Sequence, residues 1–318
     1  MFSFFVTCTF SVLFAKHEEK SFLSWMRRTN QFFTGDEYHL RFGIFLSNSR
    51  RVQEFNSAHK SFKVSVNKFA CYTPSEYRIL LGLRRHVSTS NRQKIVKKAA
   101  GNEPDYVDWR EKGIVNEIKN QGQCGSCWAF GSIQACESAY ALAHGTLNSC
   151  SEQNLIDCVP NCYGCNGGFP TSAVNYVILN QAGQFNSESD YPYKAVEESC
   201  KYDASKAINK ILSWKSGKAG DEDYLKTLVS KGVCAIGIDA APWSFQSYSS
   251  GIYDEPECSS EFLDHSVGLV GYGTENGVDY WIVRNSWGTD WGEKGYIRMS
   301  RNKDNQCGVA TDTFQVYA

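Results

Sequence analysis

The chain has 318 residues, of which 42% are hydrophobic and 21% charged, and its formal net charge is −1. This composition excludes a disordered or fibrous protein, and the near-neutral charge argues against binding to nucleic acid. At roughly 150 residues per domain, the length predicts about two folding units. Thirteen cysteines indicate an oxidising compartment, although metal binding also uses this residue type, and their odd count leaves at least one thiol unpaired.

Charge is divided unevenly along the chain. Residues 16–100, the basic block, carry 17 Lys and Arg against 6 Asp and Glu, a net charge of +11. Residues 101–318 carry 16 against 28, a net charge of −12. Opposite charges of this size favour docking of one part on the other, and protonation of carboxylates at low pH weakens the attraction. Two domains with different surfaces and no coupling are the alternative.

The first 15 residues predict a signal peptide. Residues 2–15 (FSFFVTCTFSVLFA) are apolar and uncharged, are shorter than a membrane span, and end in the small residue Ala15. A buried amphipathic helix is the alternative. No later segment of the sequence is long and apolar enough to predict a membrane span.

The basic block predicts helices followed by a polar linker. Apolar residues at helical spacing over Phe22–Asn56, interrupted near Gly35, indicate two amphipathic helices. Alternating apolar and polar residues predict a strand over Phe62–Phe69, and Thr73-Pro74-Ser75-Glu76 predicts the start of a further helix. The polar, basic stretch 84–98 predicts an exposed linker with a cleavage site.

After residue 101, predicted helices come first and predicted strands follow. Residues 127–143 are mostly apolar and end at His144 and Gly145, which predicts a buried helix with a glycine stop; a second helix is predicted from Ser151. Glycine turns separate four predicted strands, which cover residues 233–238, 266–272, 280–283 and 296–299. This order predicts an α+β fold with a cleft between two lobes.

The most specific motif is NQGQCGSCWAF at residues 120–130. Cys124 and Cys127 form a Cys-x-x-Cys pair, which redox dithiols and zinc half-sites also use. A nucleophile at Cys127 is the third interpretation, because a helix N-terminus stabilises a thiolate. Gln121 upstream and the Trp-Ala-Phe that follows favour this third interpretation.

A nucleophilic thiol needs a base, and residues 101–318 contain two histidines, His144 and His265. His144 falls at a predicted helix end, where a solvated cap is the ordinary role. His265 enters an apolar strand, where an unpartnered imidazole is costly to bury. Asn285, in the motif NSWG, could accept the ring N–H and orient it. A satisfied core histidine and a turn asparagine are the alternatives.

Together these residues resemble the papain family of cysteine peptidases, and among them the cathepsin L-like members. The resemblance implies a helical N-terminal lobe, a β-rich C-terminal lobe and an active-site cleft between them. It implies Cys127 as the nucleophile, His265 as its general base and acid, and Asn285 as the residue that orients the ring. It further implies that Gln121 is an oxyanion donor beside the Cys127 N–H, and that Trp287 shields the Asn285–His265 hydrogen bond.

The resemblance also implies the walls of the substrate site, namely Gly167, Gly168, Phe169, Pro170, Gly237, Leu263 and Ser266. The two glycines let a peptide backbone approach, while Phe169 and Pro170 line the pocket for the second residue before the cut. Asp312 follows Cys307 by five residues, where relatives that tolerate arginine in this pocket carry an acid. We therefore expect a pocket that accepts both bulky apolar residues and arginine. An exposed surface carboxylate is the alternative.

The basic block resembles the inhibitory prosegment of the same family. The motif Glu-x3-Arg-x3-Phe-x2-Asn-x3-Ile-x3-Asn is matched, with Val for Ile, by Glu37, Arg41, Phe45, Asn48, Val52 and Asn56. The following motif Gly-x-Asn-x-Phe-x-Asp is half present, because Asn67 and Phe69 match whereas Ser65 and Cys71 replace its glycine and acid. We therefore expect the overall charge opposition to cause activation by acid.

The resemblance pairs Cys124 with Cys165, Cys158 with Cys200 and Cys258 with Cys307, each bridge contributing roughly 2–4 kcal/mol. Cys136 and Cys234 are then expected to be small buried hydrophobic residues. Cys150 and Cys162 either form a fourth bridge or stay free. Zinc bound by Cys158, Cys162 and Cys165 is the competing idea, and the family's disulfides would consume two of these ligands.

We predict a cysteine endopeptidase made as a secreted, lysosomal or vacuolar zymogen, with a signal peptide (1–15), a prosegment (16–100) and a peptidase domain (101–318). The lack of a long insertion near Cys158–Cys165 favours endopeptidase activity. Expected partners are protein and peptide substrates, the chain's own prosegment and cystatin-type inhibitors, and we expect a monomer without cofactor or metal. The competing functions are an inactive binding or inhibitory homologue and a thiol-disulfide oxidoreductase.

Overall fold

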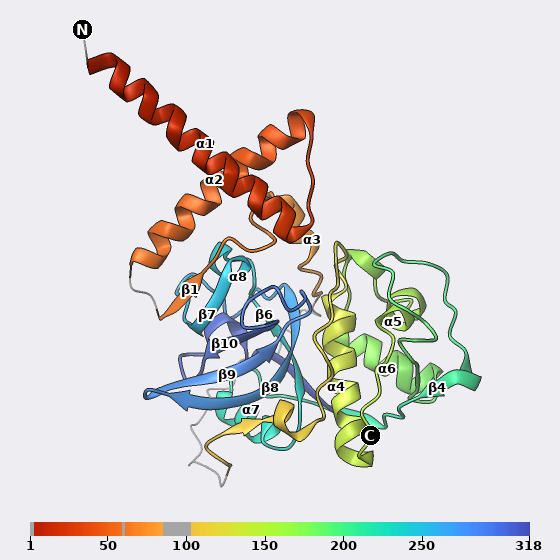
Figure 1. Ribbon diagram of the computed structural model, residues 1–318. Helices are drawn as coiled ribbons and strands as arrows, with labels where there is room; N and C mark the ends of the chain where they lie inside the picture. Colours follow the sequence, from red (N-terminus) through yellow and green to blue (C-terminus); the bar gives the residue numbers. More distant parts are fainter. Residues whose placement is uncertain (1–2, 59–60, 85–102) are drawn as a thin grey trace.

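The computed structural model describes residues 3–58, 61–84 and 103–318, with side chains from residue 16 onward (Figure 1). The predicted signal peptide, the linker from residue 85 and the boundary at residue 101 lie outside the residues or side chains described. None of the described helices combines the length and the apolarity of a membrane span.

Two long helices begin the described chain and cross each other above the rest of the molecule (Figure 1). These are α1 (Ser3–Thr29) and α2 (Gly35–Ser57), and the break between them lies where the sequence predicts it. Aromatic rings hold the crossing together: Phe22 is fully buried, with ring centroids 5.2–5.9 Å away in Trp25, Tyr38, Phe42 and Phe45. The crossing therefore has a small core of its own.

The strand predicted over Phe62–Phe69 is shorter than expected. Only β1 (Phe62–Val64) is a strand, and it pairs antiparallel with β7 (Tyr248–Tyr253). The ladder ends because the Asn67 side chain accepts the Phe69 N–H at 3.0 Å and turns the chain.

The next helix, α3 (Pro74–Ile79), begins as predicted. Thr73 and Glu76 form a reciprocal capping box at its N-terminus, and Pro74 occupies the first helical position. Beyond α3 the chain runs through residues 80–84 along the expected peptidase domain (from residue 103 in the structure), which places the end of the expected prosegment (residues 16–84 in the structure) against the cleft.

The helical lobe is built around α4 (Cys127–His144), which ends at Gly145 as predicted. Against it pack α5 (Glu152–Cys158), which Ser151 caps as predicted, and α6 (Pro170–Asn180), which the sequence analysis did not identify. The lobe is completed by the short elements η2 (Gly164–Asn166), η3 (Ala204–Lys206), β3 (Phe185–Asn186) and β4 (Ala207–Ile208), while η1 (Trp109–Lys112) packs on the sheet of the second lobe.

The second lobe is a nine-stranded sheet in the order β1-β7-β10-β9-β8-β6-β11-β5, with β2 on β8. The four predicted strands are confirmed as β6 (Cys234–Ile238), β8 (His265–Glu275), β9 (Val278–Arg284) and β10 (Tyr296–Ser300). The remaining elements are β2 (Val107–Asp108), β5 (Ser213–Ser216), β11 (Asp312–Tyr317), α7 (Glu222–Val229), α8 (Trp243–Gln246) and η4 (Gln306–Gly308). The predicted α+β architecture is thus confirmed.

The two lobes meet where α4 packs against β8 and β6. Cys127 is the first residue of α4 and His265 is the first residue of β8. The contact between lobes therefore brings together the ends of two rigid elements that carry the two expected catalytic side chains.

All three expected disulfides are present, namely Cys124–Cys165, Cys158–Cys200 and Cys258–Cys307. The possible fourth bridge does not form, because Cys150 and Cys162 are buried free thiols. Each has a nitrogen donor instead: the Asn209 amide lies 3.1 Å from Cys150 Sγ, and the Phe169 N–H lies 3.3 Å from Cys162 Sγ. The competing zinc site is not supported, since two of its three cysteines are disulfide-bonded.

Candidate active site

Cys127 lies at the N-terminus of α4 and is fully buried. Burial raises the pKa of its thiol to about 12, while hydrogen bonds from backbone groups of Ser266, Gly82 and Trp128 act in the opposite direction. Gly82 belongs to the prosegment, so part of this environment comes from the segment that covers the thiol. In this state Cys127 is a neutral thiol at pH 7.

His265 is held by Asn285 as the sequence analysis expects. Its Nε2 lies 2.8 Å from Asn285 Oδ1, which also accepts the Ser286 N–H at 2.8 Å. Because this oxygen can only accept, Nε2 carries the proton of the neutral ring and Nδ1 is left as the basic nitrogen. Burial lowers the His265 pKa to about 4 against the effect of the Asn285 hydrogen bond, so the ring is neutral at pH 7.

Trp287 covers this hydrogen bond. Its ring centroid lies 4.7 Å from that of His265, with an angle of 32° between the planes. Trp287 is almost fully buried among other aromatic rings, including Phe245 and Trp291. The pair of His265 and Asn285 is therefore kept from water on the side of Trp287.

Gln121 presents its amide nitrogen toward the cleft. Its Oε1 accepts hydrogen bonds from Ser286 Oγ at 2.7 Å and from Trp287 Nε1 at 3.1 Å. Its Nε2 donates to the carbonyl oxygens of Cys124 at 2.8 Å and of Leu80 at 2.9 Å. Leu80 belongs to the prosegment, so the proposed oxyanion donor already binds a carbonyl oxygen. Sequence reasoning missed Ser286, which fixes the orientation of this amide.

A cavity of about 380 Å³ lies beside the cleft. Five of the expected substrate-binding residues line it: Phe169, Pro170, Gly237, Ser266 and Asp312. Ile236 and Phe314 add apolar surface, and the prosegment residues Leu83 and Arg84 reach its edge. The cavity therefore joins an apolar wall to one carboxylate, and Arg84 lies at its margin.

The other expected walls lie outside this cavity. Leu263 packs with Leu83 and Cys127 in a small buried cluster. Gly168 pairs with the prosegment in a parallel bridge, donating to Gly82 O at 2.9 Å and accepting from Arg84 N at 2.8 Å. Gly167 precedes it with a φ of 109°. The backbone of these glycines thus contacts an extended segment.

Residues 80–84 of the prosegment fill the cleft. A Cβ on Gly82 would lie 1.8 Å from the carbonyl oxygen of Gly125, so only glycine fits this crossing. Leu83 donates its N–H to Asp264 O at 3.0 Å and packs on Cys127. The nucleophile is therefore covered by the chain's own N-terminal segment.

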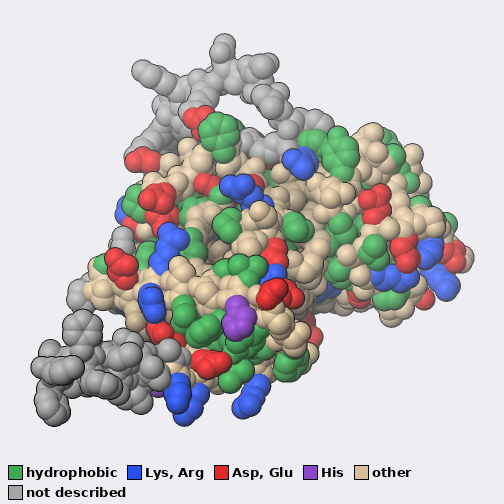
Figure 2. All heavy atoms as spheres, turned by 90° about the horizontal axis from the view of Figure 1, so that it is seen from above, with side chains coloured by type: hydrophobic (Ala, Val, Ile, Leu, Met, Phe, Trp, Pro, Cys, Tyr) green, Lys and Arg blue, Asp and Glu red, His purple; other side chains and the backbone are tan. Residues whose placement is uncertain are grey.

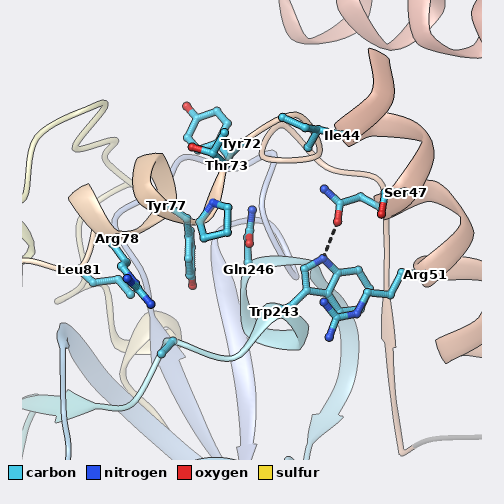
Figure 3. Close-up of a pocket in the computed structure, with 13 residues that line it drawn as sticks. Ile44, Ser47, Arg51, Tyr72, Thr73, Tyr77, Arg78, Leu81, Trp243 and Gln246 are labelled. Atoms are coloured by element: carbon cyan, nitrogen blue, oxygen red, sulfur yellow. Dashed lines mark hydrogen bonds between the residues drawn. The ribbon is translucent and has the colours of Figure 1, made fainter. Parts of the chain in front are cut away.

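A second group of contacts, at a distance from the cleft, attaches the prosegment to the peptidase domain (Figure 3). Trp243 Nε1 donates to Asn48 Oδ1 at 3.0 Å, and the Arg51 guanidinium lies 4.2 Å from the centre of the Trp243 ring. Tyr77 Oη donates to Ala240 O at 2.6 Å. These contacts frame a cavity of about 420 Å³ between α2, α3 and the peptidase domain (Figure 3).

The contacts between prosegment and peptidase domain are mainly rings and backbone hydrogen bonds. Across the described ranges, the ion pair that joins the two parts is Lys68 with Asp290, at 3.0 Å. On the face seen from above, Lys and Arg lie among Asp and Glu instead of forming one continuous patch (Figure 2). Among the described residues, the charge opposition counted in the sequence is therefore not expressed as a series of direct ion pairs.

Cys71 replaces the acid of the prosegment motif, and Glu76 provides a carboxylate nearby. Arg41 Nη1 lies 2.6 Å from Glu76 Oε2, and Arg41 Nη2 lies 2.5 Å from Glu76 Oε1. Cys71 contributes its carbonyl oxygen to the same guanidinium at 2.9 Å. The Arg41 hydrogen bonds lower the Glu76 pKa to about 2. Sequence reasoning recognised Glu76 as a helix-start residue and missed this pairing.

Comparisons with known proteins agree with this architecture. A family model described as papain family cysteine protease matches residues 103–317, and one described as cathepsin propeptide inhibitor domain (I29) matches residues 22–77. Cysteine proteinase 3 of Dictyostelium discoideum is 42% identical over 305 residues, 93% of this chain and 90% of the relative.

Cathepsin L1 of Drosophila melanogaster is 40% identical over 292 residues, 86% of this chain and 78% of the relative. The structure of digestive procathepsin L2 proteinase from Tenebrio molitor larval midgut has a TM-score of 0.87 and 35% identity, and the match covers 95% of this chain and 100% of that one. The chain belongs to the papain family of cysteine proteases and carries the cathepsin propeptide inhibitor domain at its N-terminus.

Proposed function

We propose that this papain-family cysteine proteinase is the zymogen of an endopeptidase that uses Cys127 as its nucleophile. The observation that carries the proposal is that Asn285 holds His265 at 2.8 Å, while the backbone of the next residue, Ser266, hydrogen-bonds the Cys127 thiol at the α4 N-terminus. Gln121 supports it, because its amide binds the Leu80 carbonyl as it would bind a substrate oxyanion.

In the proposed mechanism, the Cys127 Sγ–H proton moves to Nδ1 of His265 after the prosegment leaves. The thiolate attacks the scissile carbonyl carbon, and the oxyanion is stabilised by Gln121 Nε2 and the Cys127 N–H. The imidazolium then protonates the leaving amine as the carbon–nitrogen bond breaks, which leaves a thioester. His265 next removes a proton from water, which hydrolyses the thioester and regenerates the thiol.

The covered state is inactive for two reasons under this proposal. Residues 80–84 occupy the cleft, and burial keeps both Cys127 and His265 neutral at pH 7, with pKa values of about 12 and about 4. Release of the prosegment admits water, which moves both pKa values toward their ordinary range and favours transfer of the thiol proton to the imidazole.

Acid activation follows from the same burial. The pKa of His265 is about 4 in the covered state and 6.5 in its ordinary state. Between these pH values an exposed His265 that has not taken the thiol proton binds one from solvent, which the covered ring excludes, so falling pH favours release. The expected weakening of the overall charge opposition acts in the same direction.

The cavity beside the cleft supports a pocket for bulky apolar side chains and for arginine. Asp312 lies in it together with Phe169 and Pro170. We expect Asp312→Asn to lower kcat/KM for a substrate with arginine in this pocket by roughly tenfold, since a hydrogen bond to a charged group contributes about 1.5–3 kcal/mol. The rate with phenylalanine stays within about twofold. Equal losses for both substrates would contradict the assignment.

The remaining expectations stay proposals. Three disulfides support synthesis into a secreted or lysosomal compartment. Protein and peptide substrates, cystatin-type inhibitors and a monomeric state are expected for such an enzyme. A thiol-disulfide oxidoreductase is disfavoured, because Cys124 is bonded to Cys165 and is not available to pair with Cys127.

The test is cleavage of fluorogenic peptides ending in Phe-Arg and Arg-Arg by acid-treated, reduced protein. We expect activity in the native chain and a loss on the order of 10³-fold or more in Cys127→Ser. Properly processed protein without activity would favour the inactive binding homologue, and activity that survives Cys127→Ser would overturn the thiolate mechanism.

A further inference from the structure

A chain of hydroxyl groups joins the two ends of the loop that carries the proposed oxyanion donors. Tyr193 Oη donates to the backbone oxygen of Gln121 at 2.7 Å and lies 2.7 Å from Ser126 Oγ. A phenol has one proton, and a carbonyl oxygen can only accept. The Tyr193 proton therefore goes to Gln121, and Ser126 donates to Tyr193.

The Ser126 hydroxyl has an unusual use. Ser126 is the N-cap residue of α4, a position where serine ordinarily accepts an N–H of the first helical turn. Its side chain makes no capping bond and is fully buried with Tyr193 as its partner. The N–H of Trp128 is left to the Cys127 thiol. The Ser126 hydroxyl therefore links the residue before the nucleophile to Tyr193 instead of to the helix.

Tyr193 is itself rigidly held. Its ring packs edge-on against Phe130, with centroids 4.9 Å apart and planes at 78°, and its N–H donates to Glu188 Oε1 at 2.9 Å. Burial raises the pKa of the Tyr193 hydroxyl, so it keeps its proton over the whole working range of such an enzyme. Tyr193 is thus held by residues outside the loop 121–126, whose two ends its hydroxyl connects.

We propose that Tyr193 is a positioning residue of the oxyanion hole, acting through Gln121 on one side and Ser126 on the other. Gln121 supplies the side-chain donor, and Ser126 directly precedes Cys127, whose N–H is the backbone donor. Tyr193 therefore fixes the distance between the two donors. This inference rests on the proposed role of Gln121 in the reaction.

Removing only the hydroxyl should misalign the donors without unfolding the loop. In Tyr193→Phe the ring remains on Phe130, and the loop keeps the Cys124–Cys165 disulfide and the bond from Gln121 N to Ser286 O at 2.8 Å. Loss of one whole oxyanion donor costs about 10²–10³-fold in kcat. Because misalignment removes part of that effect, we expect kcat to fall by about 5–20-fold with KM within about twofold.

Tyr191→Phe is the matched control. Tyr191 lies two residues earlier, and its buried hydroxyl donates to Asp157 Oδ2 at 2.7 Å and accepts the Lys201 N–H at 3.0 Å. The hydrogen bonds described for Tyr191 go to Ser151, Asp157, Ser187 and Lys201, away from the loop that carries Gln121. We expect Tyr191→Phe to leave kcat within about twofold, whatever its effect on stability. Ser126→Ala removes the other end of the hydroxyl chain and is expected to lower kcat as Tyr193→Phe does.

The deciding measurement is kcat of the enzyme obtained by acid activation of the full-length chain, with the enzyme concentration determined by active-site titration. Tyr193→Phe is measured in the native background and again in the Gln121→Ala background. A positioning role predicts that Tyr193→Phe has less than about a twofold effect once Gln121 is alanine, because the group it positions is gone. An equal loss in both backgrounds, or no loss in the native background, would overturn the inference. A Gln121→Ala enzyme with unchanged kcat would instead refute the proposed role of Gln121.

Discussion

The prosegment and the peptidase domain are stabilised in different ways. The peptidase domain has three disulfides and two large apolar cores, one in each lobe. The α1–α2 crossing has no described disulfide. Its small core has six buried residues, namely Phe22, Trp25, Met26, Phe45, Ala70 and Cys71. The rest of the prosegment packs on the sheet lobe through rings such as Phe69 and Tyr77. We therefore expect the peptidase domain to stay folded under conditions in which the prosegment unfolds and leaves it.

The largest expected effect comes from breaking the small aromatic core. Trp25 is 1% exposed and its Nε1 donates to Asn67 O at 2.8 Å, so it links α1 to the segment that leads into the cleft. Trp25→Ala should destabilise the prosegment by about 3–5 kcal/mol. We expect peptidase activity at pH 7 before any acid treatment.

Phe32→Ala is the control for this variant, because Phe32 is 69% exposed and directly precedes Phe33, which packs on the same core. It should leave the untreated chain inactive at pH 7. After acid processing, both variants should have the native kcat, since both residues lie in the inhibitor domain that processing is proposed to remove. If the untreated Trp25→Ala chain is fully inactive, the α1–α2 core is not what keeps the prosegment on the peptidase domain.

The next effect concerns His265, whose low pKa in the covered state is the proposed link between prosegment release and pH. Each unit of decrease between pH 6.5 and about 4 should favour release up to about tenfold. The measurement is hydrogen exchange of residues 62–84 in the Cys127→Ser chain, with and without His265→Asn. We expect a flatter dependence on pH in the His265→Asn chain.

This comparison separates His265 from its neighbour Asp264. Burial raises the Asp264 pKa to about 7, so its protonation as pH falls acts in the opposite direction and stabilises the covered form. Asp264 is present in both chains, and its contribution cancels in the difference between them. Identical slopes in the two chains would exclude His265 as a source of acid release.

A smaller effect is expected for the pair of Arg41 and Glu76. The Glu76 pKa is lowered from 4.5 to about 2, so the pair stabilises the prosegment above pH 4.5 and loses this effect as pH falls toward 2. With the Glu76 side chain 32% exposed, we expect Glu76→Gln to cost about 1–2 kcal/mol at pH 6 and almost nothing at pH 2.

The measurement is the urea midpoint of prosegment unfolding in the Cys127→Ser chain at both pH values. Glu18→Gln is the control, since Glu18 pairs with Arg50, whose side chain is 67% exposed. Its effect should stay below about 0.5 kcal/mol. A loss in Glu76→Gln that is as large at pH 2 as at pH 6 would point to packing instead of charge.

The smallest effect is expected for the ion pair between Lys68 and Asp290. The Asp290 side chain is 59% exposed to solvent. Asp290→Asn should therefore weaken prosegment docking by less than about 1 kcal/mol. Raising the salt concentration at pH 7 should loosen the prosegment in both chains, with the larger response in the native one. Hydrogen exchange of residues 62–84 measures this, and no response to salt would refute the charge opposition as a cause of activation.

Much of the site could be predicted because its chemistry is written in short local motifs. Cys127 opens a helix, and His265 and Asn285 stand at the ends of strands, so the sequence places all three on rigid elements. The helix and strand boundaries near them follow from capping residues and glycines that act locally.

The parts that could not be predicted depend on tertiary contacts. The strand expected over Phe62–Phe69 stops early because Asn67 folds its side chain onto the following backbone. Glu76 gains Arg41 across 35 residues, which its role as a capping residue does not reveal. Tyr193 is 72 residues from Gln121 and 67 residues from Ser126 along the chain, and the spacing in the sequence contains no signal for these hydrogen bonds.

Removal of the prosegment has a consequence for the sheet itself. β1 covers the outer side of β7, and its loss turns β7 into a free edge whose N–H and C=O groups could pair with another chain. β1 pairs with Ser250 and Gly251 of this edge, although Gly251 has a φ of 91°. The edge that holds the prosegment in the zymogen is therefore left open to another extended chain once the prosegment has gone.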